Sequence, residues 1–376
     1  MVFYIQISLL AFFVAVGGKL RRIIYMKRTV LKTDEEIAAA KESAAVMLCQ
    51  LYDKIIALSD NTVPLYDFVE DYFFQDIDYQ MLQPNIPMWV ADAGRSPESP
   101  CSKSYYDGLR KTCNDPLTNR IIHWFDVQNL LAAFQDRICA LIPYLKDIFK
   151  EIPPCCLYND VDYTNVSRMI NPTSDRIHTS INNVFVSMAS AFDLFTKVVY
   201  ECAKYDPNGF DTYKRLKSRA NSVLYAKKNN GFDELKESGL LYDEPASIRT
   251  ICSFRDEFIH CGSWDHRCAI YYPYIDGIPV EPFIPMPDVE PTGVLTSSGS
   301  RNKFYATGAK INTVMPMLVD DAIEILLKTE NRLEEVLKAK TNPVPDVERQ
   351  KAVDVYMGKV TKNFAKQFKV TVKVNL

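Results

Sequence analysis

Arg255 and His260 are the two side chains best suited to chemistry on a phosphate, and they lie five positions apart in a chain that has only four histidines. They begin and end the segment RDEFIH, which falls in a predicted helix from Pro245 to His260. On an ideal helix the two residues differ by roughly 140° in azimuth and about 7.5 Å in height. Arginine is long and His260 is near the helix end, so both can reach a groove where this helix meets a neighbour.

These side-chain types suit metal-free cleavage of RNA, in which a ribose 2′-hydroxyl attacks the adjacent phosphate. Histidine has an unperturbed pKa near neutrality and transfers protons, whereas arginine binds phosphate bidentately and keeps its charge. One histidine cannot act as base and acid in a single step, so two copies of the chain in a dimer would complete the set. The pair predicts an endoribonuclease that needs no metal and no cofactor.

A less specific interpretation of the pair stays open. An arginine and a histidine at this spacing are commonly a surface cation and a capping histidine near a helix C-terminus. Two residues of an earlier predicted helix, Asp193 and Lys197, are supporting candidates. Asp193 would pair with Arg255 or remain a solvated charge at the helix edge, and Lys197 would contact phosphate or serve as an ordinary exposed cation.

The cysteines and the remaining histidines give little support for a metal site. Cys261, His266 and Cys268 have the spacing C-x4-H-x-C, which matches no usual zinc knuckle and has no second pair nearby. The ten cysteines are scattered, and several fall in apolar helical stripes, which is typical of reduced thiols in a cytosolic protein. His123 and His178 are interpreted as packing or capping groups.

Composition sets limits on size and on partners. The chain has 376 residues, 47% hydrophobic and 24% charged, which is enough for two domains of usual size. Its net charge is −3, so contact with nucleic acid requires a local basic patch rather than attraction by the whole molecule. Residues 213–228 form a short basic segment.

Apolar periodicity predicts an N-terminal helical domain over residues 29–152. Thr33 and Glu36 form a capping box at the start of a helix that runs to about Ser59, and a second apolar stretch covers residues 65–82. An irregular surface excursion is expected over residues 84–116, and an amphipathic helix over residues 119–150 with a kink near Pro143. The polar, proline-bearing residues 153–172 are the predicted boundary.

A second helical domain is predicted over residues 173–340. It contains a long helix over residues 177–202, the helix that Gly262 ends, and a closing helix over residues 317–340. Two runs with strand-like composition, residues 268–275 and 301–311, flank a proline-rich loop and predict a small hairpin or flap. The basic tail, residues 341–376, ends in apolar alternation that suggests an edge strand or an arm.

Residues 1–28 form an apolar leader with two open interpretations. Residues 1–18 carry no charge, and five basic residues follow before residue 29. This is the order of a short membrane anchor with a cytoplasmic flank, not of a secretory signal. Alternatively, Met26 is the true start and the leader is an upstream extension. In both cases we expect the bulk of the chain in the cytoplasm.

The stretch SIRTICSFRDEFIHCG, residues 247–262, resembles the signature helix of the HEPN superfamily, which has an arginine, four to six residues and then a histidine. The resemblance extends to the long helix upstream and the closing helix downstream, over about residues 175–340. It implies an up-and-down helical bundle, dimerisation through the motif helices and, in many members, metal-independent endoribonuclease activity in prokaryotic defence or toxin systems. By position, Arg255 and His260 would be catalytic.

The chain departs from the commonest form of that motif at Asp256, where an asparagine or another small polar residue often stands. A carboxylate there would orient Arg255 or His260, or would repel phosphate. A second hypothesis is therefore a catalytically inactive module that binds RNA or a partner protein and uses the helix as a dimer face. The expected partners are RNA, a second copy of the chain and an antitoxin or other protein, with a membrane only if the leader is real.

Overall fold

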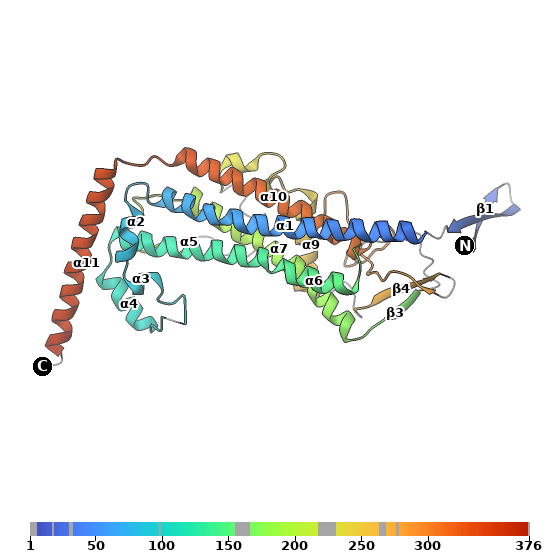
Figure 1. Ribbon diagram of the computed structural model, residues 1–376, viewed down its shortest axis with the longest axis horizontal. Coiled ribbons are helices and arrows are strands. Elements are labelled where there is room, and N and C mark those ends of the chain that lie inside the picture. Colours follow the sequence, from blue (N-terminus) through green and yellow to red (C-terminus); the bar gives the residue numbers. More distant parts are fainter. Residues whose placement is uncertain are drawn as a thin grey trace.

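The computed structural model describes residues 6–16, 19–29, 33–97, 99–154, 166–216, 231–262, 268–275 and 278–374. Long helices dominate it, so the prediction of a mainly α-helical protein with a small β element is confirmed (Figure 1). The long helices are α1 (Asp34–Phe73), α5 (Pro116–Cys139), α6 (Leu141–Glu151), α7 (Pro172–Ala203), α9 (Ala246–Cys261), α10 (Ile311–Lys340) and α11 (Asp346–Val374). Shorter helices are α2 (Tyr79–Leu82), α3 (Met88–Ala91) and α4 (Lys103–Thr112).

Successive long helices alternate in direction, except that α6 continues the direction of α5 and also runs against α7. Between α1 and α5 the contacts run from Ser59 with Cys139 to Phe73 with Trp124, and between α5 and α7 from His123 with Glu201 to Phe134 with Phe195. In both pairs the position rises along one helix as it falls along the other. Helix α9 runs against α7 in the same way, and α10 lies along α1 in the same direction, where Lys54 pairs with Asp320 and Asn61 with Glu330. The arrangement is an up-and-down bundle, and Figure 1 shows α1, α5, α7 and α10 side by side.

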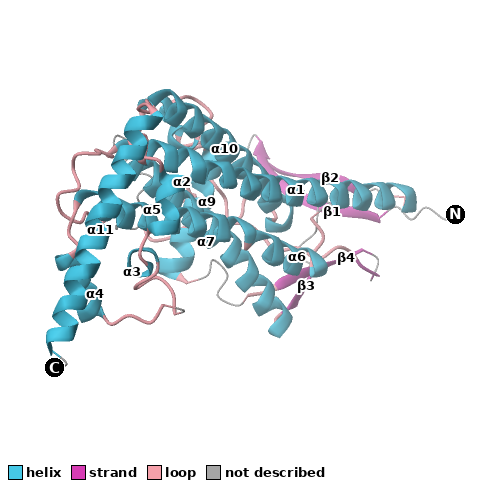
Figure 2. Ribbon diagram, turned by 60° about the vertical axis from the view of Figure 1, so that its left-hand side comes forward, coloured by secondary structure: helices cyan, strands magenta, loops and turns pink. Residues whose placement is uncertain are grey.

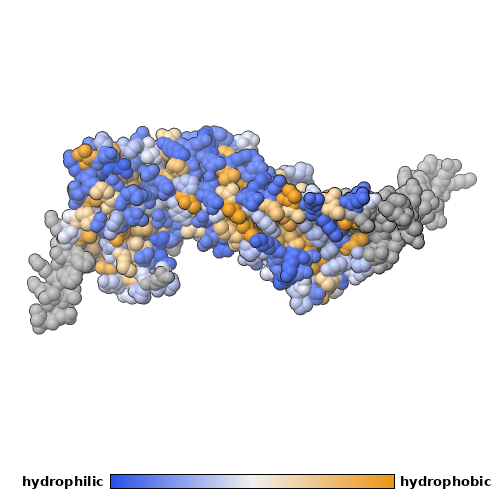
Figure 3. All heavy atoms as spheres, viewed as in Figure 1, coloured by the Kyte–Doolittle hydropathy of each residue, from blue (hydrophilic) through white to orange (hydrophobic). Residues whose placement is uncertain are grey.

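One hydrophobic cluster joins helices from both predicted domains. Its largest fully buried side chains include Trp124 and Phe134 from α5, Phe185 and Phe192 from α7, and Phe254 from α9. On the face seen in Figure 3, hydrophilic residues predominate and apolar residues form small separated patches. The boundary predicted over residues 153–172 stays a prediction, since residues 155–165 lie outside the described part, but the helices on its two sides share this cluster.

Helix α1 begins as the sequence predicts and ends later. Thr33 accepts a hydrogen bond from the Glu36 backbone, and the Glu36 carboxylate accepts one from the Thr33 backbone, which is the predicted capping box. The two predicted segments, to Ser59 and over residues 65–82, are wrong, because one helix runs through Pro64 to Phe73. Leu58 and Leu65 on either side of the proline are fully buried in the same cluster, and this packing outweighs the lost backbone hydrogen bond.

A small antiparallel sheet lies beside the bundle, in the order β3 (Val166–Met169), β4 (Ile270–Ile275) and β5 (Ile278–Pro279). The predicted strand over residues 268–275 is confirmed, and its partner β3 is not predicted from the sequence. The strand expected over residues 301–311 is wrong. Isolated bridges pair Ser298 with Arg301 and Pro285 with Lys310, so this segment folds through turns before α10 begins at Ile311.

The ends of the chain correct two further expectations. The strands β1 (Gln6–Val16) and β2 (Lys19–Thr29) pair in antiparallel fashion and do not form a helical anchor, which fits their content of β-branched and aromatic residues. In the described residues, no helix has both the length and the apolar character needed to cross a bilayer. The tail forms the helix α11, not a strand, because Val353 and Tyr356, one turn apart, are buried against the bundle.

The strands and α11 occupy opposite ends of the molecule. Figure 2 shows the strands near the start of α1, while α11 stands across the other end of the bundle. A backbone hydrogen bond from Val344 to the Gln75 carbonyl ties the segment before α11 to the end of α1. The long helices α7 and α9 carry the first group of residues considered below, whereas α4 and the segment after α7 carry the second.

Candidate functional site

Helix α9 carries the predicted pair and has one buried face. Pro245 precedes the helix as its cap residue, and Gly262 follows it with φ +88°, a conformation that favours glycine. Phe254 is fully buried, and its ring stacks on Phe185 of α7 with the centroids 4.8 Å apart. This packing fixes the rotation of α9 and therefore decides where Arg255 and His260 lie.

Arg255 lies at the border between the buried and exposed faces of α9. Its guanidinium group is 3.0 Å from the Asp256 carboxylate and 4.0 Å from the Asp193 carboxylate of α7. The side chain is 14% exposed, so it has little freedom to leave these partners. The structure thus brings together three of the predicted residues, with Asp193 and Asp256 holding the cation in place.

His260 lies on the exposed face of α9, in its last turn. Asp256 and Ile259 lie on the same face, since residues three and four apart on a helix are neighbours. Ile259 is 55% exposed, although a large apolar side chain gains by being covered. No hydrogen bond or ion pair joins His260 to Arg255 within the described part of one chain, so the pair does not form a finished site by itself.

Lys197 is half-buried on α7, one turn beyond Asp193. Among the residues that the structure describes, no hydrogen bond or ion pair connects it to Arg255 or His260. Its charge lies on the same face of α7 as Asp193, because the two residues are four apart. Lys197 is therefore placed to add positive potential beside Arg255 rather than to touch it.

The charges around Arg255 define what this site can do. Two carboxylates beside one guanidinium orient it, but they also compete with any phosphate for its hydrogen bonds. A histidine at the exposed helix end is free to approach a ligand or a second protein. The arrangement can supply a positioned cation and a proton-transfer group, and it would need another molecule to bring them to one phosphate.

The described residues around α9 do not form a metal site. No group of three or more histidine, cysteine, aspartate or glutamate side chains with a geometry for a metal occurs among them. Cys261 is exposed and Cys268 is partly buried, while His266 lies outside the described residues. Glu257, also in this helix, is buried and accepts a hydrogen bond from Asn302, so it stabilises the segment before α10.

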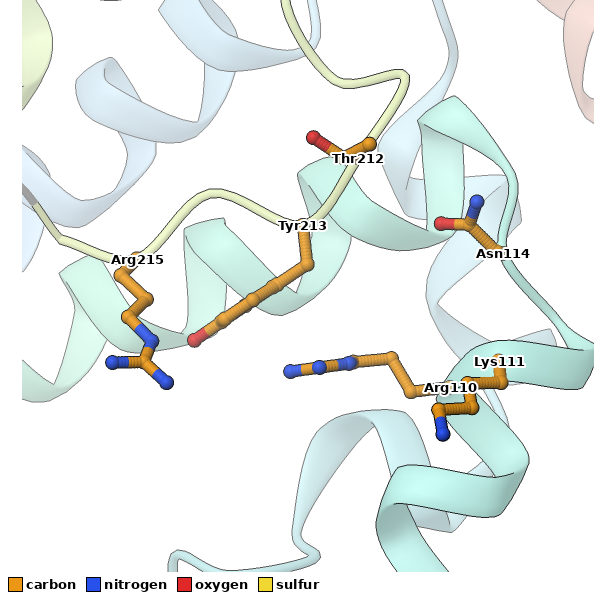
Figure 4. A pocket seen from close by; sticks show the side chains of 6 residues that line it. All are labelled: Arg110, Lys111, Asn114, Thr212, Tyr213 and Arg215. Carbon is orange, nitrogen blue, oxygen red and sulfur yellow. The ribbon is translucent and has the colours of Figure 1, made fainter.

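A second group of residues comes together elsewhere and is not among the candidates that spacing selects. A pocket of about 480 Å³ is lined by Arg110, Lys111, Asn114, Thr212, Tyr213 and Arg215 (Figure 4). The short basic segment from residue 213 is the only sequence signal that points to it. Arg110 and Lys111 belong to the stretch expected to be an irregular excursion, where the structure has the helix α4.

Comparisons with known proteins add no family or function. No protein-family model, curated protein or solved structure matches the chain. The resemblance to the HEPN superfamily therefore stays a prediction that rests on residues 247–262 and the helices around them. The function has to be inferred from the geometry of α9 and its neighbours.

Proposed function

We propose that the protein is a metal-independent endoribonuclease that works as a homodimer, with Arg255 and His260 of both copies at one shared groove. The observation that supports it most is the exposed face of α9, where Ile259 lies beside His260. A second copy packed on this face would cover the apolar side chain and bring two histidines together. Cytoplasmic action belongs to the same proposal and is supported by the scattered cysteines and the basic flank of residues 1–18. A role in a defence or toxin-type system with an antitoxin rests on the resemblance alone.

The proposed reaction transfers two protons, forms a bond between the 2′-oxygen and phosphorus, and breaks the bond between phosphorus and the 5′-oxygen. One His260 removes the proton of the ribose 2′-hydroxyl, and the oxygen attacks the adjacent phosphorus. The second His260 donates a proton to the leaving 5′-oxygen as its bond to phosphorus breaks. Arg255 stabilises the additional negative charge on the phosphate oxygens in between. The products are a 2′,3′-cyclic phosphate and a 5′-hydroxyl.

Asp193 and Asp256 act in this proposal as positioning residues. Held by both carboxylates, the guanidinium loses little conformational freedom when phosphate arrives. Lys197 contributes positive potential that offsets part of their charge. The cost is competition for Arg255, so binding of RNA has to displace at least one of the two contacts.

Cleavage of labelled RNA in EDTA by purified full-length protein tests the proposal. Arg255→Ala and His260→Ala should each lower the rate about 10²-fold or more, while helicity and dimer mass stay unchanged. Lys351→Ala, an exposed lysine on α11, is the matched control and should cleave as the wild type does. Equal rates in the wild type and both α9 variants would remove the proposal.

A catalytically inactive module that binds RNA or a partner protein is the second candidate. One observation favours it, namely that Arg255 is only 14% exposed and is already in contact with two carboxylates. In that case RNA would bind without being cut, and His260→Ala would leave its affinity unchanged. Fluorescence anisotropy with the same labelled RNA separates the two candidates.

A further inference from the structure

We propose that the pocket between α4 and the segment after α7 binds a nucleotide through its phosphate groups. Its volume of about 480 Å³ is that of a small-molecule site. One wall comes from Arg110, Lys111 and Asn114 at the end of α4, and the other from Thr212, Tyr213 and Arg215. This proposal does not depend on cleavage at Arg255 and His260.

The pocket concentrates positive charge, and none of the described residues that line it is a carboxylate. Figure 4 shows Arg110 extending from α4 toward the side of the pocket on which the guanidinium group of Arg215 lies. Within the described ranges, neither arginine nor Lys111 makes an ion pair. Like charges that face one space repel each other, and an anion between them removes that cost.

Two carboxylates close to the pocket have partners of their own. Asp126 accepts a hydrogen bond from the Tyr213 hydroxyl at 3.0 Å, and burial together with this carboxylate raises the pKa of that hydroxyl. Asp107, one turn before Arg110 on α4, pairs with Lys103 at 2.6 Å. Lys103 is the main cause of the lowered pKa of Asp107, with smaller contributions from Arg110 and Lys111, so these acids offset only part of the positive charge of the pocket.

Arg110 is held in an orientation that suits a phosphate. Its guanidinium carbon lies 4.8 Å from the centre of the Tyr213 ring, a cation–π contact that limits its rotation. A planar guanidinium fixed in this way presents a fork of N–H donors that matches two phosphate oxygens. Lys111, the next residue of α4, adds a positive charge on a flexible side chain that can follow the phosphate.

The opposite wall is anchored to the core of the bundle. Asn119 of α5 donates a buried hydrogen bond to the Phe210 carbonyl at 3.0 Å, and a ring nitrogen of His123 lies 3.4 Å from the Lys214 carbonyl. His123 is itself buried beside Glu201 of α7, at 3.7 Å. These contacts fix the backbone on both sides of Tyr213, so His123 and Asn119 are positioning residues for the pocket.

Size and chemistry favour a nucleotide over a bare phosphate. Inorganic phosphate would fill a small part of 480 Å³ and would leave Asn114 and Thr212 unused. Both residues can hydrogen-bond a sugar or a base, and bases stack on tyrosine rings and guanidinium planes. A free nucleotide and a nucleotide within an RNA strand share this chemistry, so the test includes both.

Titration of the full-length protein with ATP, with inorganic phosphate and with a labelled single-stranded RNA tests the proposal. We expect ATP or the RNA to bind more tightly than inorganic phosphate. Arg110→Ala and Arg215→Ala should each weaken that binding about 10- to 100-fold, as the loss of a charged hydrogen-bond partner does. Preference for ATP identifies a free nucleotide, and binding of RNA alone identifies a strand.

Controls separate this site from α9 and from misfolding. Lys351→Ala should keep wild-type affinity for ATP and for RNA, and circular dichroism should show unchanged helicity in Arg110→Ala and Arg215→Ala, neither of which alters α9. Since Arg110 also packs on Tyr213, Arg215→Ala is the cleaner variant. Equal affinity for inorganic phosphate and ATP, no binding of either nucleotide form, or wild-type affinity in Arg215→Ala would each overturn the proposal.

Discussion

At the scale of single residues, Arg255 is a partly buried cation held between two carboxylates, an arrangement that suits either phosphate binding or a purely structural role. The sequence suggests both contacts as alternatives, and the structure places the guanidinium 4.0 Å from Asp193 and 3.0 Å from Asp256. The type and spacing of Arg255 and His260 select them from the sequence. Spacing does not show that Arg255 is partly buried and His260 exposed, because the packing of Phe254 on Phe185 in the core sets the rotation of α9.

Asp193→Asn tests whether this carboxylate positions Arg255. The amide keeps the shape of the side chain but removes its charge, so Arg255 should be held less firmly. If the proposed reaction occurs, we expect a fall in cleavage of about 3- to 10-fold, smaller than that for Arg255→Ala. Restored cleavage in Asp193→Glu would support positioning. Cleavage as slow as in Arg255→Ala would instead indicate that Asp193 has a direct role.

Glu330 on α10 should make stability depend on pH. Its carboxyl group is fully buried, and burial raises its pKa from the ordinary 4.5 to about 7, despite a hydrogen bond from Asn61. The folded state therefore holds the proton more tightly than the unfolded state. This contribution to the free energy of unfolding is fully present below pH 4.5 and is lost as the pH rises to about 7.

Glu330→Gln isolates that contribution. At pH 8 the variant should be more stable than the wild type by about 1–3 kcal/mol, because a neutral amide replaces a buried charge. Near pH 4.5 the two proteins should differ little. Urea unfolding at both pH values measures this, and a variant that is less stable at pH 8 would contradict the pKa of Glu330.

At the scale of elements, local signals locate the helices and tertiary packing corrects their ends. The capping box at Thr33 and the glycine after α9 both mark helix ends as predicted. The run through Pro64 and the helix α11 could not be predicted, because both depend on burial against distant residues. The pocket at Arg110 and Arg215 is missed for the same reason, since its walls are about a hundred positions apart.

Gly262→Ala should destabilise the end of α9. A Cβ there meets no atom within 4 Å, so the cost comes only from φ +88°, and we expect about 1–2 kcal/mol. Gly358→Ala is the matched control, because this glycine lies inside α11 with open space around it. The control should be neutral or slightly stabilising. Thermal unfolding of both variants makes the comparison, and equal effects would contradict strain at Gly262.

At the scale of the whole molecule, the proposed function requires two copies that meet through α9. The bundle presents Ile259 and His260 on one exposed face, while the pocket at Arg110 lies against α4 and the segment after α7. A dimer through α9 would thus leave cleavage and nucleotide binding as separately testable properties. The net charge of −3 gives neither site help at long range, so RNA binding should weaken steeply as salt rises.

Ile259→Glu tests the dimer face. A charge at the centre of an apolar contact should shift the protein to monomer, which light scattering after gel filtration would show as half the mass. Val355→Glu, at a similarly exposed apolar position on α11, should leave the mass unchanged. A wild type that is monomeric at high concentration, or an Ile259→Glu variant that stays dimeric, would contradict assembly through this face.

The most direct test of the central claim is the chemistry of the RNA ends produced by the wild-type dimer in excess EDTA. Cleavage by 2′-hydroxyl attack predicts fragments with a 2′,3′-cyclic phosphate and a 5′-hydroxyl, absent with His260→Ala. Fragments that carry a 5′-phosphate, cleavage that stops in EDTA, or intact RNA after long incubation would contradict it.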